Sequence, residues 1–175
     1  MTFATAWDAL LDIERGYVNN PRDRGGPTNF GVTERVARAH GYEGDMRDLP
    51  IAAARRIAKL EYWDPLRLDA IDLKAPALAS ELLDIRYNMW RDAAGMFLQR
   101  ALNALQTTTL TLDGRVGPKT LSALYGYLQR RGRDGETVLL RMLNAQQCVD
   151  YLRQCEDDAI KRDFIYGWVL KRVKV

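Results

Sequence analysis

The chain has 175 residues, of which 47% are hydrophobic and 28% are charged, and its formal net charge is +3. This composition is ordinary for a folded globular protein, and so small a charge gives no reason to expect nucleic acid as a partner. No run of residues approaches the ~18 consecutive apolar positions of a membrane-spanning helix, so we expect no stable insertion into a membrane.

The first expected element is an amphipathic helix over residues 3–15, because apolar side chains recur there at helical spacing. Asp8 lies within this apolar stretch and no basic segment precedes it, so the pattern does not predict a secretory signal. Residues 17–33 are instead rich in asparagine, proline and glycine. Their short apolar alternations predict a small β-hairpin.

Helical patterns dominate the rest of the chain. Pro76 and Pro118 suit the first turn of a helix, and Asp48 and Asp92 suit N-caps. Gly41 suits a helix end. The expected helices cover residues 34–40, 50–62, 76–90, 93–106, 118–129, 135–154 and 157–172. The turn-forming segment 106–117 is the expected division between two regions, 1–106 and 107–175.

The two cysteines, Cys148 and Cys155, fall within one expected helix. Seven helical residues separate them by about 10.5 Å along the axis, whereas a disulfide needs Cα atoms less than ~7 Å apart. We therefore expect two free thiols and folding in a reducing compartment. The single histidine, His40, lies far away in sequence, so we expect no metal site.

One cluster of residues suggests chemistry. Glu14 ends the first expected helix, and the glycine-rich hairpin that follows carries Asp23 and Thr28. Hydrolysis of a β-glycosidic bond needs a proton donor, and a polar or negative group near the anomeric carbon. Glu14 can be the donor if apolar surroundings such as Tyr17 keep it protonated, while Asp23 and Thr28 face it across a cleft. Alone, the same acids are also explained as a solvated charge and a turn residue.

The surrounding string strengthens the catalytic interpretation. It resembles the signature of glycoside hydrolase family 108, the N-acetylmuramidases of phages and bacterial secretion systems. The matching residues are Glu14, Gly16, Tyr17, Pro21, Asp23, Gly25, Gly26, Thr28, Gly31, Val32 and Thr33. Arg15 departs from the pattern, since the family usually has glycine there. The spacing also resembles the Glu-Asp-Thr triad of phage-type lysozymes, with one residue fewer before the threonine.

The resemblance extends along most of the chain. Tyr62-Trp63-Asp64 is similar to the family's tyrosine-tryptophan element, and Asp84 and Asn88 fall where a further helical motif is expected. Residues 98–103, 113–121 and 164–172 resemble the peptidoglycan-binding module that ends these proteins. From the residues themselves, Asp84 is expected to be structural, and Asp113 and Pro118 have a turn-and-cap explanation.

The resemblance implies a predominantly α-helical, lysozyme-like α+β fold with a small β-hairpin beside the active cleft. It implies a catalytic region over 1–106 and a peptidoglycan-binding-like module, packed against it, over 107–175. The implied reaction hydrolyses the β-1,4 bond between N-acetylmuramic acid and N-acetylglucosamine without a metal or organic cofactor. Glu14 is the implied general acid, and Asp23 and Thr28 position water. Candidate substrate-binding residues are Tyr17, Gly26, Asn29, Tyr62, Trp63 and Asn88.

Two other functions stay open. A lytic transglycosylase would use one glutamate and the muramic acid's own 6-hydroxyl, giving 1,6-anhydro products. A non-catalytic wall-binding protein would keep the fold alone. In either enzymatic reading the partner is peptidoglycan, and we expect a monomer. The expected role is that of a bacteriolytic phage endolysin, made in the host cytoplasm without a signal peptide and acting in the periplasm or wall after holin-dependent release.

Overall fold

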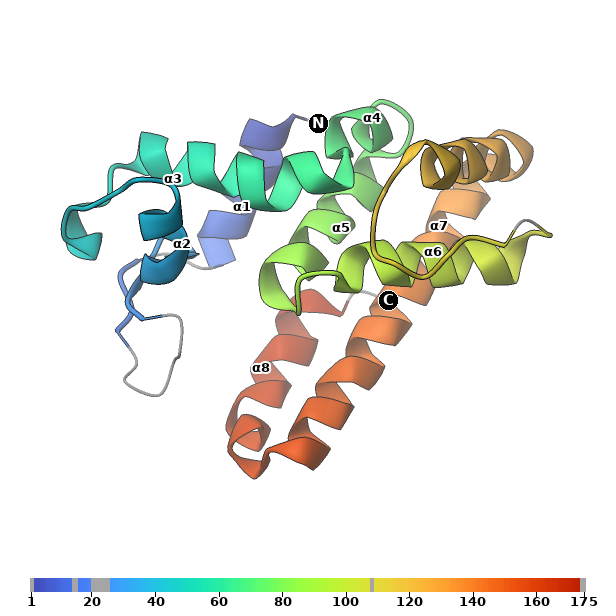
Figure 1. Ribbon diagram of the computed structural model, residues 1–175. Coiled ribbons are helices and arrows are strands. Elements are labelled where there is room, and N and C mark those ends of the chain that lie inside the picture. Colours follow the sequence, from blue (N-terminus) through green and yellow to red (C-terminus); the bar gives the residue numbers. More distant parts are fainter. Residues whose placement is uncertain (1, 14–15, 20–25, 108, 174–175) are drawn as a thin grey trace. The chain divides into compact units, whose positions relative to one another are not determined.

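The computed structural model describes residues 2–13, 16–19, 26–107 and 109–173 (Figure 1). The described chain is predominantly helical and contains one small antiparallel sheet. This arrangement confirms the expected α+β class with a β-hairpin. The chain divides into two compact units, Met1–Asp69 and Ala70–Val175, and each is described by itself.

The first unit begins with the expected N-terminal helix and hairpin. Its elements are α1 (Phe3–Ile13), β1 (Thr28–Asn29), β2 (Val32–Thr33), α2 (Glu34–Ala39), a 3-10 helix (Met46–Asp48), α3 (Ile51–Ala58), a π-helix (Lys59–Trp63) and a second 3-10 helix (Asp64–Leu66). α1 buries Phe3, Trp7 and Leu11 along one side. The Phe3 ring stacks on Trp7 at 6.4 Å between centroids and meets Trp63 edge-on at 5.4 Å. These aromatic contacts hold α1 against the π-helix.

The ends of α2 agree with the sequence, whereas the start of α3 does not. Thr33 is the N-cap of α2, where its side chain accepts a hydrogen bond from Val36 N–H, and Gly41 follows the helix with a φ of +80°. The prediction that Asp48 caps the next helix is wrong. Asp45 caps the short 3-10 helix that contains Asp48, and Pro50 is the N-cap of α3. Asp45 caps the 3-10 helix because its side chain accepts a hydrogen bond from Arg47 N–H at 2.8 Å.

The second unit consists of helices. α4 (Leu68–Asp72) contains the division between the units. It is followed by α5 (Pro76–Asn88), α6 (Ala93–Leu105), α7 (Pro118–Asp157), a 3-10 helix (Ala159–Lys161) and α8 (Arg162–Arg172). α7 is two helices joined at Gly132, whose φ of 57° and ψ of −141° are not helical. The expected break between residues 129 and 135 is thus a single-residue kink. Cys148 and Cys155 lie on the same helix and are free, as predicted.

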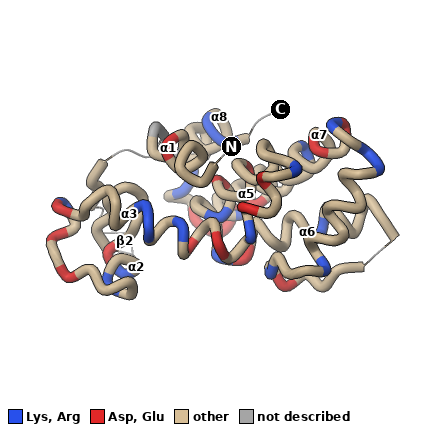
Figure 2. The backbone as a smooth tube through the Cα atoms, turned by 90° about the horizontal axis from the view of Figure 1, so that it is seen from above, with Lys and Arg blue, Asp and Glu red and all other residues tan. Residues whose placement is uncertain are grey.

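The core of the second unit forms around α5. Leu78, Leu82 and Ile85 are fully buried along one side of the helix. Ala79, Glu81, Leu83 and Arg86 are buried on its other sides, so the helix has no pronounced polar face. α5 also carries a buried acid, Glu81, whose Oε1 accepts a 3.1 Å hydrogen bond from Asn144 of α7. Basic and acidic residues are interspersed along the chain in Figure 2, in keeping with the small net charge. Over the described ranges, every helix is too short or too polar to cross a membrane.

Candidate functional site

In the hairpin of the first unit, Thr28 lies between Val18 on one side and Thr33 on the other. Val18 and Thr28 form an antiparallel bridge in which each N–H donates to the other's carbonyl at 2.8 Å. On its other side Thr28 pairs with Thr33. Since opposed residues of an antiparallel ladder share one face, the three side chains lie on the same side. Val18 is exposed there, so Thr28 belongs to the outward face of the hairpin.

The adjacent residue, Asn29, faces the opposite way. Its side chain is buried, and its Nδ2 donates to the carbonyls of Met46 at 2.7 Å and Arg47 at 3.3 Å. These bonds tie the hairpin to the 3-10 helix. Asn29 therefore fixes the position of the strand that carries Thr28.

The hairpin turn contains a residue in an unusual backbone conformation. Phe30 and Gly31 have φ angles of 49° and 69°, so both central positions of this two-residue turn are left-handed. Glycine and asparagine adopt this conformation readily, but a bulky side chain does so rarely. Backbone strain of this kind concentrates at functional sites. Sequence patterns alone did not single out Phe30. An aromatic residue before glycine in a two-residue hairpin turn does, however, indicate a strained backbone conformation.

Gly26 and Tyr17 flank the same hairpin. Gly26 has a φ of +76°, a conformation that favours glycine, and a Cβ there would lie 3.2 Å from Glu34 Oε2. Tyr17 is half-buried, and the guanidinium of Arg47 lies 5.0 Å from its ring centroid. Both candidate residues therefore lie next to the hairpin, with Glu34 beside Gly26 and Arg47 beside Tyr17.

The tyrosine-tryptophan element forms the end of the π-helix. Trp63 is only 1% exposed, and its Nε1 donates to Asp69 Oδ1 at 2.8 Å. Its neighbour Tyr62 is half-buried. Glu61 Oε1 lies 2.8 Å from His40 Nε2, and this hydrogen bond joins the end of α2 to the π-helix. Single-turn π-helices occur frequently at functional sites. Here the buried indole of Trp63 holds in place the turn that carries Tyr62.

The π-helix also carries a paired lysine. Lys59 hydrogen bonds to Asp64, and this bond raises the pKa of the Lys59 ammonium above its usual range, against the smaller opposing effect of burial. Asp69 adds a longer contact at 3.4 Å. The pair fixes the start of the π-helix to the 3-10 helix that follows it.

The remaining candidates fall elsewhere. Glu14 and Asp23 lie outside the described residues, so the structure gives no geometry for them. Asn88 belongs to the second unit, at the end of α5, where its Nδ2 donates to Asp84 O at 2.8 Å and to Asp84 Oδ1 at 3.2 Å. The structure thus brings Tyr17, Gly26, Thr28 and Asn29 together on one hairpin, and holds Tyr62 and Trp63 on the π-helix.

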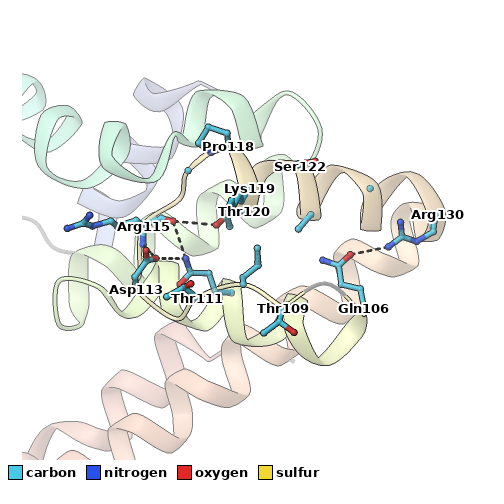
Figure 3. Close-up of a pocket in the computed structure, with 15 residues that line it drawn as sticks. Gln106, Thr109, Thr111, Asp113, Arg115, Pro118, Lys119, Thr120, Ser122 and Arg130 are labelled. Atoms are coloured by element: carbon cyan, nitrogen blue, oxygen red, sulfur yellow. Dashed lines mark hydrogen bonds between the residues drawn. The ribbon is translucent and has the colours of Figure 1, made fainter.

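A second feature is a groove in the second unit. It has a volume of about 1200 Å³ and runs between the first part of α7 and the segment that links α6 to α7. Figure 3 shows Arg115 at one end and Arg130 at the other. The turn at Asp113 forms part of its wall. A hydrogen bond from Gln99 Nε2 at 2.8 Å, followed by one from Arg115 N–H, lowers the pKa of the Asp113 carboxyl below its usual range.

Two family models match the chain. Residues 7–89 match the model described as glycosyl hydrolase 108, and residues 93–173 match one described as a predicted peptidoglycan domain. The chain therefore contains a segment similar to the glycosyl hydrolase 108 family, followed by a segment similar to the peptidoglycan family. Its second match covers the groove. Together, the two matches support a peptidoglycan hydrolase.

A solved structure supports the fold. The chain of Brucella abortus SagA superimposes with a TM-score of 0.66 at 22% sequence identity, covering 99% of this chain and 96% of that one. No curated protein sequence matches the chain. The structural likeness over both chains confirms the lysozyme-like, predominantly helical fold class.

Proposed function

We propose that the protein is an N-acetylmuramidase, which hydrolyses the β-1,4 bond between N-acetylmuramic acid and N-acetylglucosamine. The observation that carries the proposal is the hairpin. It presents Thr28 on its outward face inside the segment that matches the glycosyl hydrolase 108 model. The motif residues Glu14 and Asp23 precede it at the spacing of the family signature.

The mechanism assigns one role to each motif residue. Glu14 donates its proton to the glycosidic oxygen as the bond from the anomeric carbon to that oxygen breaks. Asp23 and Thr28 hold the water that attacks the anomeric carbon, and the proton lost from this water leaves through the carboxylate. The products are a reducing N-acetylmuramic acid end and a free hydroxyl on N-acetylglucosamine. This chemistry requires no metal or organic cofactor.

The other candidate residues shape the saccharide site. Tyr17 and Tyr62 are half-buried aromatic residues suited to contact sugar faces, and Gly26 keeps the backbone beside Glu34 accessible. Asn29 and Trp63 are buried, so they contribute by holding the hairpin and the π-helix in place. Asn88 belongs to the second unit, where its amide donates to Asp84.

The test is digestion of purified peptidoglycan, with the fragments identified by mass spectrometry. Replacing Glu14 with glutamine removes the transferable proton and is expected to lower the rate by about 10²–10⁴-fold. Glu43→Gln is the matched control, since Glu43 is an exposed acid of the same unit. The wild type and the control should release reducing muramic acid ends, and Glu14→Gln should not.

The same experiment separates the alternatives. Fragments lighter by one water would identify a lytic transglycosylase. Binding to peptidoglycan without fragments, from wild type and Glu14→Gln alike, would identify a non-catalytic wall-binding protein. Equal cleavage by the two proteins would remove Glu14 from the mechanism.

We also propose the role of a bacteriolytic phage endolysin, monomeric, with catalysis in residues 1–106 and wall binding in 107–175. The free thiols of Cys148 and Cys155 support folding in the reducing host cytoplasm. Release to the wall then depends on a membrane pore of the holin type. Lysis of host cells only when the protein is expressed together with such a pore would support this role, and lysis without the pore would contradict the dependence.

A further inference from the structure

The groove of the second unit is a preformed feature held by two amide side chains of α6. Gln99 Oε1 accepts from Gly114 N–H at 2.9 Å, and its Nε2 also donates to Arg115 O at 3.1 Å. One turn further along, Asn103 exchanges two hydrogen bonds with the backbone of Leu110, at 2.6 and 2.9 Å. The segment linking α6 to α7 is therefore fixed at both ends of the groove, so a ligand does not have to order it.

The charged side chains that line the groove are mostly basic. Three basic residues, Arg115, Lys119 and Arg130, line it against a single acid, Asp113. The Oδ1 atom of that acid already accepts from Gln99 Nε2 and Arg115 N–H. Exposed hydroxyl groups of Thr109, Thr111 and Ser122 lie between the charged ends. The lining therefore favours a ligand rich in acceptors and negative charge.

The amide of Gln106 gives independent evidence for such a ligand. Its Oε1 accepts from Arg130 at 3.0 Å, which directs its Nε2 to the other side, toward the groove (Figure 3). This Nε2 atom is buried and has no hydrogen-bond partner among the described residues. A buried donor without a partner costs free energy, and an acceptor in the groove would satisfy it once the Gln106 side chain turns outward, since the atom itself is not solvent-accessible.

The start of α7 adds two backbone donors. Gly117 is the N-cap and has no side chain to cap the helix, and the first bond of the helix runs from Leu121 N–H to Gly117 O. The N–H groups of Lys119 and Thr120 therefore have no partner within the helix. Both residues line the groove, where the positive end of the helix dipole also favours an anion.

The lining and length of the groove identify which part of peptidoglycan it suits. None of the fifteen described lining residues is aromatic, so the groove lacks the flat faces that stack on sugar rings. From Lys119 to Arg130 the helix rises about 17 Å at 1.5 Å per residue. An extended peptide of roughly five residues spans this distance. The groove thus has the dimensions and donors for a short, acidic peptide.

We propose that this groove binds the stem peptides of peptidoglycan through their carboxylates and backbone carbonyls. The inference rests on the proposed function, because peptidoglycan is the polymer on which the protein acts. It goes beyond that function by assigning attachment to the peptide rather than the glycan. Arg115 and Arg130 at opposite ends pair with carboxylates, and Gln106 Nε2 donates to the peptide between them.

The test measures binding in the full-length Glu14→Gln protein, so that the polymer is not consumed. The groove variant adds Arg115→Glu, Lys119→Glu and Arg130→Glu. The control adds Arg133→Glu, Arg141→Glu and Arg153→Glu, exposed positions of the same unit outside the groove, with the same change in charge. Circular dichroism verifies that both fold. The probes are purified peptidoglycan, soluble stem peptides released by an amidase, and glycan strands stripped of peptide.

We expect the control to bind peptidoglycan like the parent and the groove variant to bind at least about tenfold more weakly, because charge-assisted hydrogen bonds are lost. Soluble stem peptides should shift NMR signals of the groove backbone and of the Gln106 side-chain amide. Equal binding by the two variants, or signal shifts with stripped glycan but not with stem peptide, would overturn the proposal. The digestion experiment tests the proposed function separately, since cleavage that does not depend on Glu14 would contradict that function and leave the groove untouched.

Discussion

At the scale of single residues, two glycines permit the closest approach of backbone segments in the second unit. A Cβ on Gly95 of α6 would overlap the carbonyl oxygen of Gly114, closer than any real contact. Gly114 itself has a φ of +73°, and a Cβ there would lie 2.6 Å from Asp92 Cβ. The turn at the end of the groove therefore rests directly on the first turn of α6, which only glycine allows.

Replacing Gly95 with alanine should therefore destabilise the protein. The added methyl group displaces the backbone at Gly114, and overpacking against backbone costs about 3 kcal/mol. Gly167→Ala is the matched control, because Gly167 lies in α8 and a Cβ added there would meet nothing within 4 Å. At that position the helix propensity of alanine should add about 0.5–1 kcal/mol of stability. Urea unfolding monitored by circular dichroism measures both changes, and equal midpoints for Gly95→Ala and the wild type would contradict the close approach.

A buried tyrosine should make the stability fall at alkaline pH. Tyr151 is 3% exposed, and burial raises the pKa of its phenol to about 12. Because the pKa is higher in the folded state than in the unfolded chain, the stabilising effect is complete below about pH 10. It is lost as the pH rises toward 12, since the unfolded chain releases its proton first. Burial also raises the pKa of Tyr127, which adds to the same trend.

The Tyr151→Phe variant should therefore show a weaker loss of stability between about pH 10 and 12 than the wild type. The hydrogen bond from Gln147 Nε2 to the phenol, at 3.1 Å, is lost as well, so the variant should be less stable at neutral pH. Tyr166→Phe serves for comparison, because Tyr166 is 78% exposed. Its pH profile should match that of the wild type, and identical profiles for all three proteins would rule out Tyr151 as a source of the alkaline loss.

At the scale of elements, an ion pair connects the last helix to α5. Arg172 NH1 of α8 lies 2.7 Å from Asp84 Oδ1, and the arginine side chain is only 5% exposed. Asp84 Oδ2 also accepts a 3.5 Å hydrogen bond from Gln147 of α7. The structural role expected for Asp84 thus takes the form of a polar link between three helices.

Removing the acid should cost more than removing both charges. Asp84→Ala takes away the ion-pair partner of a buried guanidinium, which is expected to lower the free energy of unfolding by about 2–4 kcal/mol. The double variant Asp84→Leu/Arg172→Leu leaves no charge at this pair and should recover part of the loss. Thermal unfolding of the two proteins gives the comparison. A double variant less stable than Asp84→Ala would show that the charges themselves stabilise the link.

Local signals predicted most of the helices. Thr33 and Gly41 bound α2 because a hydroxyl cap and a left-handed glycine act within a few residues of the chain. Pro76 and Pro118 begin α5 and α7 for the same reason. The π-helix was expected only as the end of the helix over residues 50–62, since a single turn of five residues is too short for apolar spacing to distinguish a π-helix from an α-helix.

The candidate site was predicted in part. The hairpin was expected from its turn-forming residues, but the burial of Asn29 was not, because its partners are carbonyls near residue 46. The groove was also missed. Tertiary packing alone brings Gln99 of α6 and Arg130 of α7 to its walls, and their separation in sequence hides the cluster.

At the scale of the whole molecule, the family matches and the compact units divide the chain at different places. The glycosyl hydrolase 108 match ends at residue 89 and includes α5, whereas the first compact unit ends at Asp69. α5 packs instead with α6 and α7, which belong to the second match. The hydrolase segment therefore supplies a central helix of the unit that contains the wall-binding family.

This overlap predicts how the second unit can be isolated. A fragment of residues 93–175 matches the peptidoglycan family almost completely, yet it lacks Leu78, Leu82 and Ile85, all fully buried between helices. Each buried leucine or isoleucine contributes about 1.5–3 kcal/mol, so their combined loss is comparable to the total stability of a typical small domain. A fragment of residues 68–175 keeps α4 and α5, including the 2.8 Å hydrogen bond from Tyr125 to Ala70 O. Circular dichroism and urea unfolding should show a cooperative transition for 68–175 and none for 93–175. A cooperative transition in the shorter fragment would mean that the wall-binding family folds without the helix from the hydrolase segment.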